Sequence, residues 1–474
     1  MTTTTLATLA LLGVFAILLF AKIPVTFSLL LATLCSALVK GTPLTTMIRM
    51  MIDGVNNFSL LSIPFFILMG EIMSAGQISD KIVDLANLIV GRFRGGLAYV
   101  NCIDSMFFGG ISGSAVADVS SLGSVVIPLM KKQGYSGEFS VGLTVTTACQ
   151  GVLIPPSHNM VIYALAAGGG VSIGRLFMAG AIPGMFLGFS LLLLCMLMST
   201  KYKFPQGFRI GPKDPVRWMK FSRSKAQGWH LVKKAETWIV IQNPWFTVEM
   251  GKCIQIIVNA ILPLFTLIII MVGVGMGIFT ATESSAIACV YVFMLTYFVF
   301  RTSRLRDFPK VLKNSLKTLA VVLTLIATAK AFAYMMTELR IPSAITNALI
   351  SLTDNKYMLL LIINALLLIL GCFMDMAPLI MIMTPILLPV VTSPVVGMSP
   401  IHFGIMLIFN LAVGLCTPPV GSALFVGCAV GKTSMEKTTK AMLPMFAVMV
   451  VALMIVTYVP FFSMWLPNLV YGVA

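Results

Sequence analysis

Apolar runs long enough to cross a lipid bilayer recur along the whole chain. An α-helix needs about 20 apolar residues to span the hydrocarbon core, and in lipid only helices and closed barrels satisfy their own backbone hydrogen bonds. We therefore predict an all-α polytopic membrane protein with roughly ten to twelve crossings or hairpin arms. The clearest runs are Ile23–Val39, Leu176–Met198, Ile254–Val272, Ser284–Phe300, Met358–Leu370 and Met442–Val459.

The composition excludes several other classes of protein. Only 10% of the residues are charged and 58% are hydrophobic, whereas soluble domains have about 25% charged residues. The net charge of +16 does not indicate a nucleic-acid partner, because Lys and Arg are concentrated in a few loops, as on the cytoplasmic side of membrane proteins. The run Leu6–Phe20 has no basic segment before it and no small-residue cleavage site, so it is predicted to be a mature helix and not a signal peptide.

Residues that carry enzyme or metal chemistry are scattered. The nine cysteines form no C-x-x-C pair, and the three histidines, His158, His230 and His402, lie far apart in the sequence. A membrane-embedded enzyme would need His, Asp or Cys clustered on facing helices. The sequence therefore predicts no catalytic residues, no disulfides and no cofactor.

An internal repeat organises the chain. The motif at Gly151–Pro156, GVLIPP, returns at Gly414–Pro419 as GLCTPP. Further landmarks flank each copy in the same order and at nearly equal spacing. They are Ile127-Pro128 and Leu388-Pro389 upstream, and Met178–Pro183 and Lys440–Pro444 downstream.

Each repeat contains two interrupted apolar segments. One is short and rich in Gly, Ser, Asp or Pro, at 109–128 and at 372–389, and the other is broken by the Pro-Pro pair. Proline removes a backbone donor and breaks helices, and broken backbone within a membrane is tolerated only inside the protein or beside a cavity. Paired interruptions in two halves therefore indicate a transporter's binding site. Two ordinary kinked helices are the alternative.

The repeats define the predicted domains. Residues 1–200 form the first repeat, with a re-entrant hairpin at about 109–133 and a broken helix at about 136–170. Residues 253–474 form the second, with a hairpin at about 372–391 and a broken helix at about 401–430. Basic loops on one side and uncharged loops on the other predict that the two repeats are inverted in the membrane.

The segment 201–252 separates the repeats. Lys201–Lys252 holds eleven Lys or Arg, three acids and four of the five Trp. This composition is typical of a cytoplasmic linker that lies along the headgroups. Two other stretches, Thr45–Asn57 and Arg301–Lys317, are predicted to be a matching pair of short arm helices on the membrane surface.

Acids in apolar surroundings are costly and are usually functional. Asp375 and Ser112 lie at equivalent places, each 43 residues before the first proline of its Pro-Pro pair. Their oxygens, with the carbonyls freed where a helix breaks, suit a hard cation such as sodium. Capping of a half-helix is the alternative for Asp375 and the preferred role for Glu283. The full set of candidate acids is Glu71, Asp104, Asp118, Glu283 and Asp375.

Several stretches resemble a known family. They are FFGGISGSAVADVSSLGSVVIPLMKKQGY, GVLIPPSHNMVIYALAAGG, GIFTATESSAIACVY, CFMDMAPLIMIMTPILLPVV and GLCTPPVGSALFVG. Together they are similar to the large membrane (M, DctM-like) subunit of tripartite ATP-independent periplasmic (TRAP) transporters. The resemblance runs from about residue 20 to the C-terminus, and only about 205–252 falls outside it.

The resemblance implies an elevator-type transporter in the bacterial inner membrane. Such a protein imports small organic acids, for example C4-dicarboxylates or sialic acid, with sodium as the coupling ion. A periplasmic solute-binding protein delivers the substrate, and a separate small four-helix membrane subunit braces the large one in the lipid. A stand-alone sodium–dicarboxylate symporter of the same superfamily is the second reading, and a passive channel a minor one.

The resemblance also implies the site. One sodium site would use Ser112, Gly113 and Ser114 with the backbone around Gly151, Ile154 and Pro155. A second would use Asp375 with the backbone around Gly414, Thr417 and Pro418. Substrate would lie near Pro156, Ser157, His158, Asn159 and Pro419. His158-Asn159 depart from the apolar residue and Pro of many members, and Ala281 departs from Pro, so the substrate itself does not follow from the resemblance.

Overall fold

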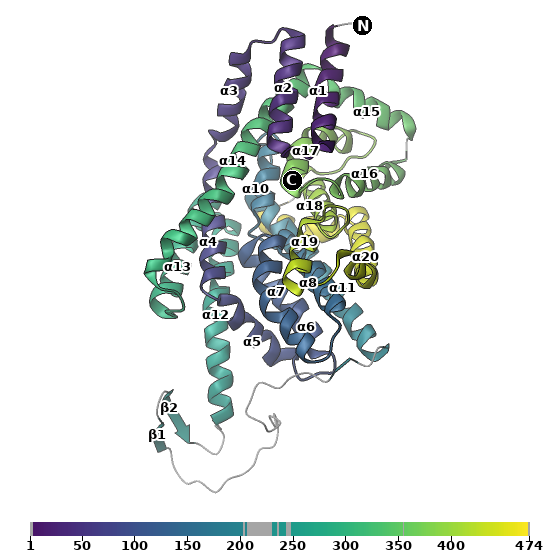
Figure 1. Ribbon diagram of the computed structural model, residues 1–474. Helices are drawn as coiled ribbons and strands as arrows, with labels where there is room; N and C mark the ends of the chain where they lie inside the picture. Colours follow the sequence, from purple (N-terminus) through teal and green to yellow (C-terminus); the bar gives the residue numbers. More distant parts are fainter. Residues whose placement is uncertain are drawn as a thin grey trace.

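The computed structural model describes residues 3–201, 204–205, 230–234, 237–242, 248–353 and 355–472. The regular elements of these residues are helices and one small two-stranded sheet (Figure 1). The prediction of an all-α membrane protein is therefore confirmed in its architecture. The first half contains α1 (Thr3–Phe20), α2 (Val25–Lys40), α3 (Leu44–Val55), η1 (Phe58–Leu61), α4 (Ser62–Ala75), α5 (Ile78–Val90), α6 (Gly96–Ser112), α7 (Ala115–Lys132), α8 (Gly137–Ala148), α9 (Gln150–Leu153), α10 (His158–Ala166) and α11 (Ile173–Lys201).

The second half repeats much of this order after the linker. Its elements are α12 (Val248–Gly275), α13 (Ala281–Met294), η2 (Leu295–Val299), η3 (Leu305–Asp307), α14 (Phe308–Glu338), α15 (Ile341–Leu352), α16 (Lys356–Gly371), α17 (Met376–Val391), α18 (Pro400–Gly414), α19 (Ser422–Gly431), α20 (Met435–Tyr458) and α21 (Phe461–Tyr471).

Seven helices of the described chain are long and apolar enough to cross a membrane. Their outer faces carry many exposed large apolar side chains, as lipid contact requires. Shorter apolar helices include both arms of one hairpin and the helices on each side of the second Pro-Pro pair. The seven spans are Thr3–Phe20, Phe58–Ala75, Ile173–Lys201, Cys253–Gly275, Ala281–Val299, Leu305–Glu338 and Met435–Tyr458.

The linker is described only in part. Its described portion includes strands β1 (His230–Lys234) and β2 (Thr237–Gln242), which pair antiparallel with His230 opposite Gln242. Trp218, Trp229 and Trp245 lie outside the described residues. The predicted placement of 201–252 along the cytoplasmic surface stays a prediction.

Each repeat contains a helical hairpin with a short turn. The first has arms α6 and α7 joined at Gly113-Ser114, and the second has arms α16 and α17 joined at residues 372–375. The predicted ranges 109–133 and 372–391 therefore correspond to the turn and the second arm. The first arm of the second hairpin, α16, corresponds to the predicted apolar run Met358–Leu370, and nothing in the sequence of either first arm marks it as half of a hairpin.

The broken helices lie where the Pro-Pro pairs stand. In the first, α8 and α9 end before Pro155-Pro156 and α10 restarts at His158. In the second, α18 ends before Pro418-Pro419 and α19 restarts at Ser422. Both Pro-Pro bonds are cis. The alternative of two ordinary kinked helices is excluded, because in each case the chain leaves the helical conformation for several residues.

Buried polar contacts repeat the internal symmetry. Asn101 and Asn364 each lie 54 residues before the first proline of their pair. The Oδ1 of Asn101 accepts a hydrogen bond from the Thr147 hydroxyl at 3.2 Å, and the Oδ1 of Asn364 accepts one from Asn410 Nδ2 at 2.9 Å. Thr147 and Asn410 are equivalent as well, eight residues before their prolines. Each contact ties the first arm of a hairpin to its own broken helix.

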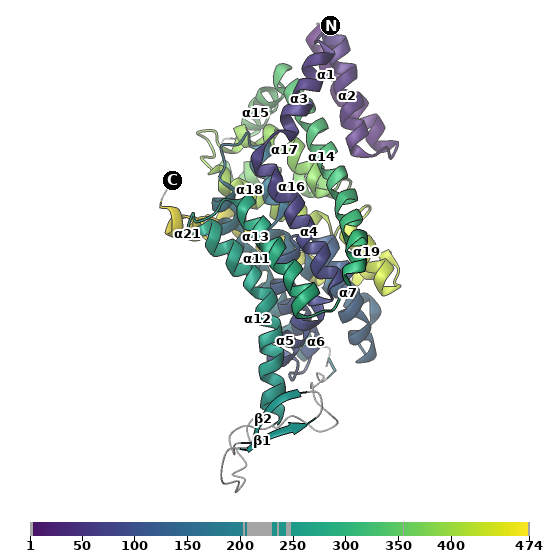
Figure 2. The same ribbon diagram turned by 90° about the vertical axis from the view of Figure 1, so that its left-hand side faces the viewer.

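Helices of each repeat also pack against the hairpin of the other repeat. The restarted helix α10 of the first repeat packs on α17 of the second, and α19 of the second packs on α7 of the first. The hairpins and broken helices thus form one inner group, α6–α10 and α16–α19. Helices α1–α4 and α12–α14 form an outer group that packs along one side of it (Figures 1 and 2).

One prediction about the outer group is wrong. Residues 301–317 do not form a separate short arm helix, because Phe308 begins α14, a continuous helix of 31 residues. Pro309 at the helix start is compatible with this continuity, since a proline in the first turn interrupts no hydrogen bond. The stretch Thr45–Asn57 does contain a short helix, α3, which packs against α14.

We expect Asn410→Leu to destabilise the protein by about 1–3 kcal/mol, because it removes the Asn410 donor from the buried Asn364 Oδ1. Thermal unfolding in detergent measures the effect. Asn314→Leu, at an exposed position of α14, is the matched control and should leave the midpoint unchanged. Equal midpoints for the two variants would show that the repeated polar contact does not stabilise the fold.

Candidate functional site

The tip of the first hairpin is a compact turn held by two serines. The Ser112 hydroxyl accepts a hydrogen bond from the Ser114 N–H at 3.1 Å. Ser114 is the N-cap of α7, and its hydroxyl accepts a hydrogen bond from Ala117 N at 3.4 Å. Between them Gly113 has a φ of 64°, in the left-handed region that glycine adopts without strain. The three residues predicted for the first ion site therefore form one turn.

This tip lies directly against the first break. A Cβ on Gly113 would lie 2.6 Å from the Pro156 carbonyl oxygen, and one on Gly110 would lie 3.3 Å from that of Pro155. Gly109 and Gly151 meet backbone to backbone, because a Cβ on either would collide with the Cα of the other. The structure thus places the turn that contains Ser112, Gly113 and Ser114 against the backbone of 151–156.

Asp118 adds a carboxylate to this turn. It is fully buried one turn into α7, and its Oδ1 accepts a hydrogen bond from the Ser112 hydroxyl. Its Oδ2 lies against Gly151 and has no hydrogen-bond partner among the described residues. A buried carboxylate oxygen without a donor is costly, so this oxygen is available to a cation.

Asp118 was counted among the candidate acids but not placed in the ion site. Its position follows from helix geometry once the helix start is known. Side chains in a helix point toward its N-terminus, so an acid four residues after the Ser114 cap reaches back to the hairpin tip. The sequence alone did not show where α7 begins.

The second hairpin tip has a related arrangement. Asp375 caps α17, accepting from Met376 N at 3.0 Å and from the Ser422 hydroxyl, at the start of α19, at 3.3 Å. The Val420 N–H donates to the Cys372 carbonyl at 3.2 Å, which fastens the turn to the second break. The capping role is confirmed, and Asp375 is exposed where Asp118 is buried.

The remaining residues of the second site are also nearby. Gly371 and Gly414 are in close backbone contact, since a Cβ on Gly414 would lie 2.9 Å from the Gly371 Cα. Thr417 and Pro418 are half-buried. The Thr417 hydroxyl donates to the Val413 carbonyl at 3.0 Å. Its side chain is therefore satisfied within the helix end, but the oxygen can still accept.

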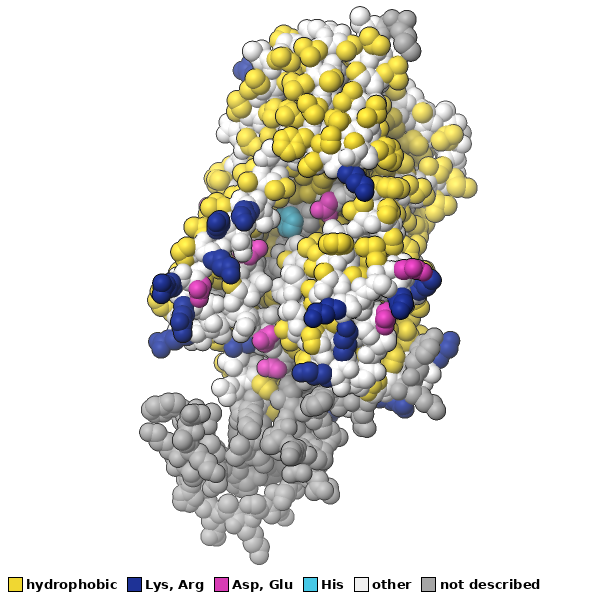
Figure 3. Space-filling view, in the orientation of Figure 1, with side chains coloured by type: hydrophobic (Ala, Val, Ile, Leu, Met, Phe, Trp, Pro, Cys, Tyr) yellow, Lys and Arg dark blue, Asp and Glu magenta, His cyan; other side chains and the backbone are white. Residues whose placement is uncertain are grey.

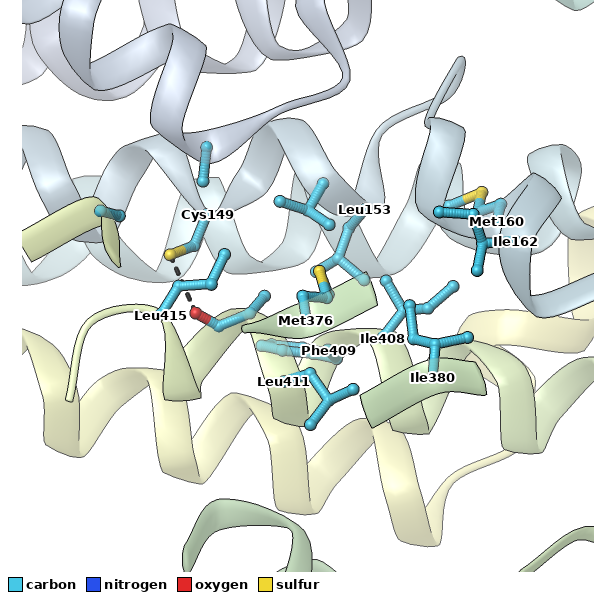
Figure 4. Packing of buried hydrophobic residues seen from close by; sticks show 14 of the residues in the cluster. Cys149, Leu153, Met160, Ile162, Met376, Ile380, Ile408, Phe409, Leu411 and Leu415 are labelled. Carbon is cyan, nitrogen blue, oxygen red and sulfur yellow. Dashed lines mark hydrogen bonds between the residues drawn. The ribbon is translucent and has the colours of Figure 1, made fainter. Parts of the chain in front are cut away.

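The two breaks adjoin at the centre of the inner group. Cys149 and Cys416, one from each repeat, have their sulfur atoms 3.0 Å apart. Cys149 Sγ also lies 3.1 Å from the Ala412 carbonyl oxygen, the contact drawn as a dashed line in Figure 4. Apolar side chains from both repeats, including Leu153, Met376 and Leu415, pack around them. This apolar contact joins the broken helices of the two repeats.

The predicted substrate residues lie at the restart of the first broken helix. Ser157 caps α10 in position but its buried hydroxyl has no hydrogen-bond partner among the described residues. His158 is half-buried and Asn159 is almost fully buried. Figure 3 shows a hollow in one face of the molecule with a histidine and acidic side chains in it, and Lys and Arg on both sides.

The two Pro-Pro pairs differ in exposure. Pro156 is buried under the first hairpin tip, whereas Pro419 is exposed. The helices that follow, α10 and α19, begin close to these pairs, and their free N–H groups carry partial positive charge. Glu283 takes no part in this region, because it closes a capping box with Thr280, which confirms its predicted capping role.

Comparison with known proteins decides the family. The profile described as "Tripartite ATP-independent periplasmic transporter, DctM component" matches residues 12–462. The chain belongs to this family. Among its relatives is the sialic acid TRAP transporter large permease protein SiaM of Vibrio cholerae, 34% identical, with 96% of this chain and 97% of the relative covered.

Further relatives cover nearly the whole chain. The C4-dicarboxylate TRAP transporter large permease protein DctM of Rhodobacter capsulatus is 32% identical, with 98% of this chain and 99% of the relative covered. The protein YgiK of Salmonella typhimurium is 37% identical, with 97% of each chain covered. Family membership makes this chain a multi-pass membrane permease, in agreement with the seven apolar spans.

A solved structure is similar in fold. The crystal structure of the Alcanivorax borkumensis YdaH transporter aligns with a TM-score of 0.59 at 14% identity, covering 90% of each chain. At this identity the likeness concerns the fold alone.

We expect Gly151→Ala to reduce uptake by about tenfold or more, because the new methyl group would displace Asp118 and the Gly109 backbone, and such overpacking costs on the order of 1–3 kcal/mol. Uptake into proteoliposomes and thermal unfolding measure the two consequences. Gly13→Ala is the control, because a Cβ there would meet no atom within 4 Å. Wild-type uptake by Gly151→Ala would contradict the close seating of the first tip.

Proposed function

We propose that this DctM-family chain is the sodium-coupled large permease of a TRAP transporter and imports a small organic acid. The observation that carries the proposal is the pairing of each hairpin tip with a broken helix in the same repeat. At the first tip this pairing leaves the buried Asp118 Oδ2 without a donor, beside the backbone of Gly151. Oxygen-only surroundings suit a hard cation such as sodium.

The first sodium site would contain Ser112, Gly113, Ser114 and Asp118 with backbone oxygens of Gly151, Ile154 and Pro155. Proline supplies no N–H, so the carbonyls that precede Pro155-Pro156 have fewer competing donors. The second site would contain Asp375 with the backbone of Gly414, Thr417 and Pro418. Sodium at each site would hold a hairpin tip to its broken helix.

The substrate would lie between the two restarted helices, near Pro156, Ser157, His158, Asn159 and Pro419. Their N-terminal N–H groups attract a carboxylate without a buried arginine. The unpartnered Ser157 hydroxyl supports this placement, because it can hydrogen-bond a ligand. Relatives named for sialic acid and for C4-dicarboxylates support an organic acid as the substrate class.

The pocket and the ion sites share the same hairpin tips. Substrate would bind well only when sodium has fixed those tips, which couples substrate to the sodium gradient. The inner group would then carry both across the bacterial inner membrane by an elevator movement relative to the outer group. Such a movement connects two positions of the inner group, and a ligand shifts the population between them only if it binds one more tightly than the other.

Two partners complete the proposed transporter. A periplasmic solute-binding protein would deliver the acid, and a small four-helix membrane subunit would cover part of the apolar outer surface in the lipid. Robust uptake by this chain alone would favour the second reading, a stand-alone sodium–dicarboxylate symporter.

The central test compares sodium dependence in proteoliposomes. We expect Asp118→Asn and Asp375→Asn each to raise the sodium concentration for half-maximal uptake by about tenfold, because each removes one charged oxygen ligand worth on the order of 1.5–3 kcal/mol. Asp307→Asn, at an exposed helix start, should match wild type. Unchanged sodium dependence in both test variants would place the ions elsewhere.

A second test concerns the energy source. Uptake should follow an inward sodium gradient and should not respond to ATP, because the chain contains no G-x-x-x-x-G-K-[ST] phosphate-binding loop. Proteoliposomes with equal sodium on both sides and internal or external ATP supply the comparison. Uptake driven by ATP under those conditions would overturn the proposal.

A further inference from the structure

A second pocket lies away from the candidate site, between the outer and inner groups. It is a small hollow of about 100 Å³ that opens to solvent. Its walls come from both groups. Asp53, Gly54 and Asn57 line it from the end of α3, Ile326 and Lys330 from α14, Leu165, Gly168 and Gly169 from the end of α10, and Met381 from α17.

Lys330 is an unusual residue for its place. It is the one charged residue between Leu319 and Met336 of α14, an apolar span. A charged side chain within a span is costly and usually faces the protein interior or a water-filled cavity. Lys330 is half-buried, and the two ion pairs found among the described residues, Lys40–Glu338 and Lys440–Glu436, do not include it.

The helix packing brings this ammonium to the pocket. A Cβ on Gly54 would lie 2.8 Å from Lys330 Cβ and 3.2 Å from its Cγ. Any larger residue at position 54 would therefore push α3 away from α14 and displace the lysine stem. Gly54 thus allows α3 and α14 to pack closely at Lys330, whose side chain lines the pocket together with residues of the inner group.

The pocket also offers complementary polar groups. Asp53 lines it without forming an ion pair with Lys330, so the two charges are more than the ion-pair distance apart. Asn57 uses its Oδ1 to accept from Ser59 N, which leaves its amide N–H groups available. A ligand that bridges these groups needs a carboxylate for Lys330 and a hydrogen-bond donor for Asp53.

The pocket is close to the proposed transport site but separate from it. α10 begins beside Ser157 and has nine residues, so its far end lies about 14 Å from the substrate residues at its start. Met381 lies six residues after Asp375 on α17, or about 9 Å along that helix. Both helices that line the pocket from the inner side therefore begin at the proposed substrate or sodium site.

We propose that this pocket is a second binding station for the transported anion, with Lys330 holding a carboxylate and Asp53 and Asn57 selecting an acid that also bears a hydroxyl group. The station lies between the outer group, which supplies its polar side chains, and the inner helices α10 and α17. It would receive the anion as it enters or leaves that site. This inference rests on the proposed function, because it takes the transported ligand to be an organic acid.

The test measures uptake with three probe acids, malate, succinate and N-acetylneuraminate, in proteoliposomes that hold the chain and its partners. Lys330→Met should raise the half-saturating concentration of a transported probe by about tenfold. This change corresponds to a loss of about 1.4 kcal/mol of binding free energy. Lys330→Arg should stay within about threefold of wild type, because it keeps the charge. Lys317→Met, at an exposed position of the same helix, should have no effect.

The hydroxyl preference has its own readout. Asp53→Asn should reduce the preference for malate over succinate, which differ by one hydroxyl group, while Asp307→Asn leaves it unchanged.

The accessibility of position 330 to a thiol reagent supplies a measurement that does not need transport. In Lys330→Cys, compared with the wild-type chain and its nine cysteines, the transported probe should slow labelling by a sulfonate-bearing thiol reagent.

The outcomes separate this inference from the function on which it rests. If wild type takes up none of the probes with sodium, the proposed function fails. If wild type transports a probe but Lys330→Met behaves as Lys317→Met and the probe does not protect Cys at 330, the second station does not exist. A third outcome is that Lys330→Met keeps the wild-type half-saturating concentration but its uptake, unlike that of wild type, depends on the fraction of anionic lipid. That result would assign the pocket to a lipid phosphate and overturn the inference.

Discussion

The structure depends on how interrupted backbone is satisfied inside a membrane. Each Pro-Pro pair stops a helix in the middle of an apolar segment, and free backbone groups inside a membrane protein are costly. The chain meets this constraint by placing a hairpin tip on each break. Gly109 lies on Gly151, and Gly371 lies on Gly414, so backbone meets backbone with no side chain between. The candidate site is a consequence of this packing, since the remaining oxygens point into the same small spaces.

The two breaks are not equivalent. Asp118 is buried and has one oxygen without a donor, whereas Asp375 is exposed and bonded to Ser422. The first tip is therefore closed around its carboxylate, and the second is open at the surface. If both sites bind sodium, this difference makes the second tip the easier one to release. The apolar contact around Cys149 and Cys416 would transmit the state of one break to the other.

Much of this arrangement could be predicted from the sequence. The repeat, the Pro-Pro breaks and the serines of the first tip are local sequence patterns, and such patterns determine the backbone conformation of their own segments. Contacts between distant segments were harder to foresee. The roles of Asn101 and Asn364 became apparent only when their partners in the broken helices were known. Asp118 was recognised as an unusual acid, but its reach to Ser112 depends on where α7 begins, and residues 301–317 were separated from α14 because their charge masked its continuity.

The most direct test of this account is the sodium dependence of backbone protection at the two tips. Hydrogen–deuterium exchange of the purified protein, in sodium and in choline at equal ionic strength, reports on the amides of residues 112–118 and 372–376. The account predicts that sodium slows exchange at both tips and at the breaks beside them, while exposed residues at the start of α14 exchange at the same rate in both salts. Equal exchange at the tips in sodium and choline would contradict the claim that sodium fastens the hairpins to the broken helices.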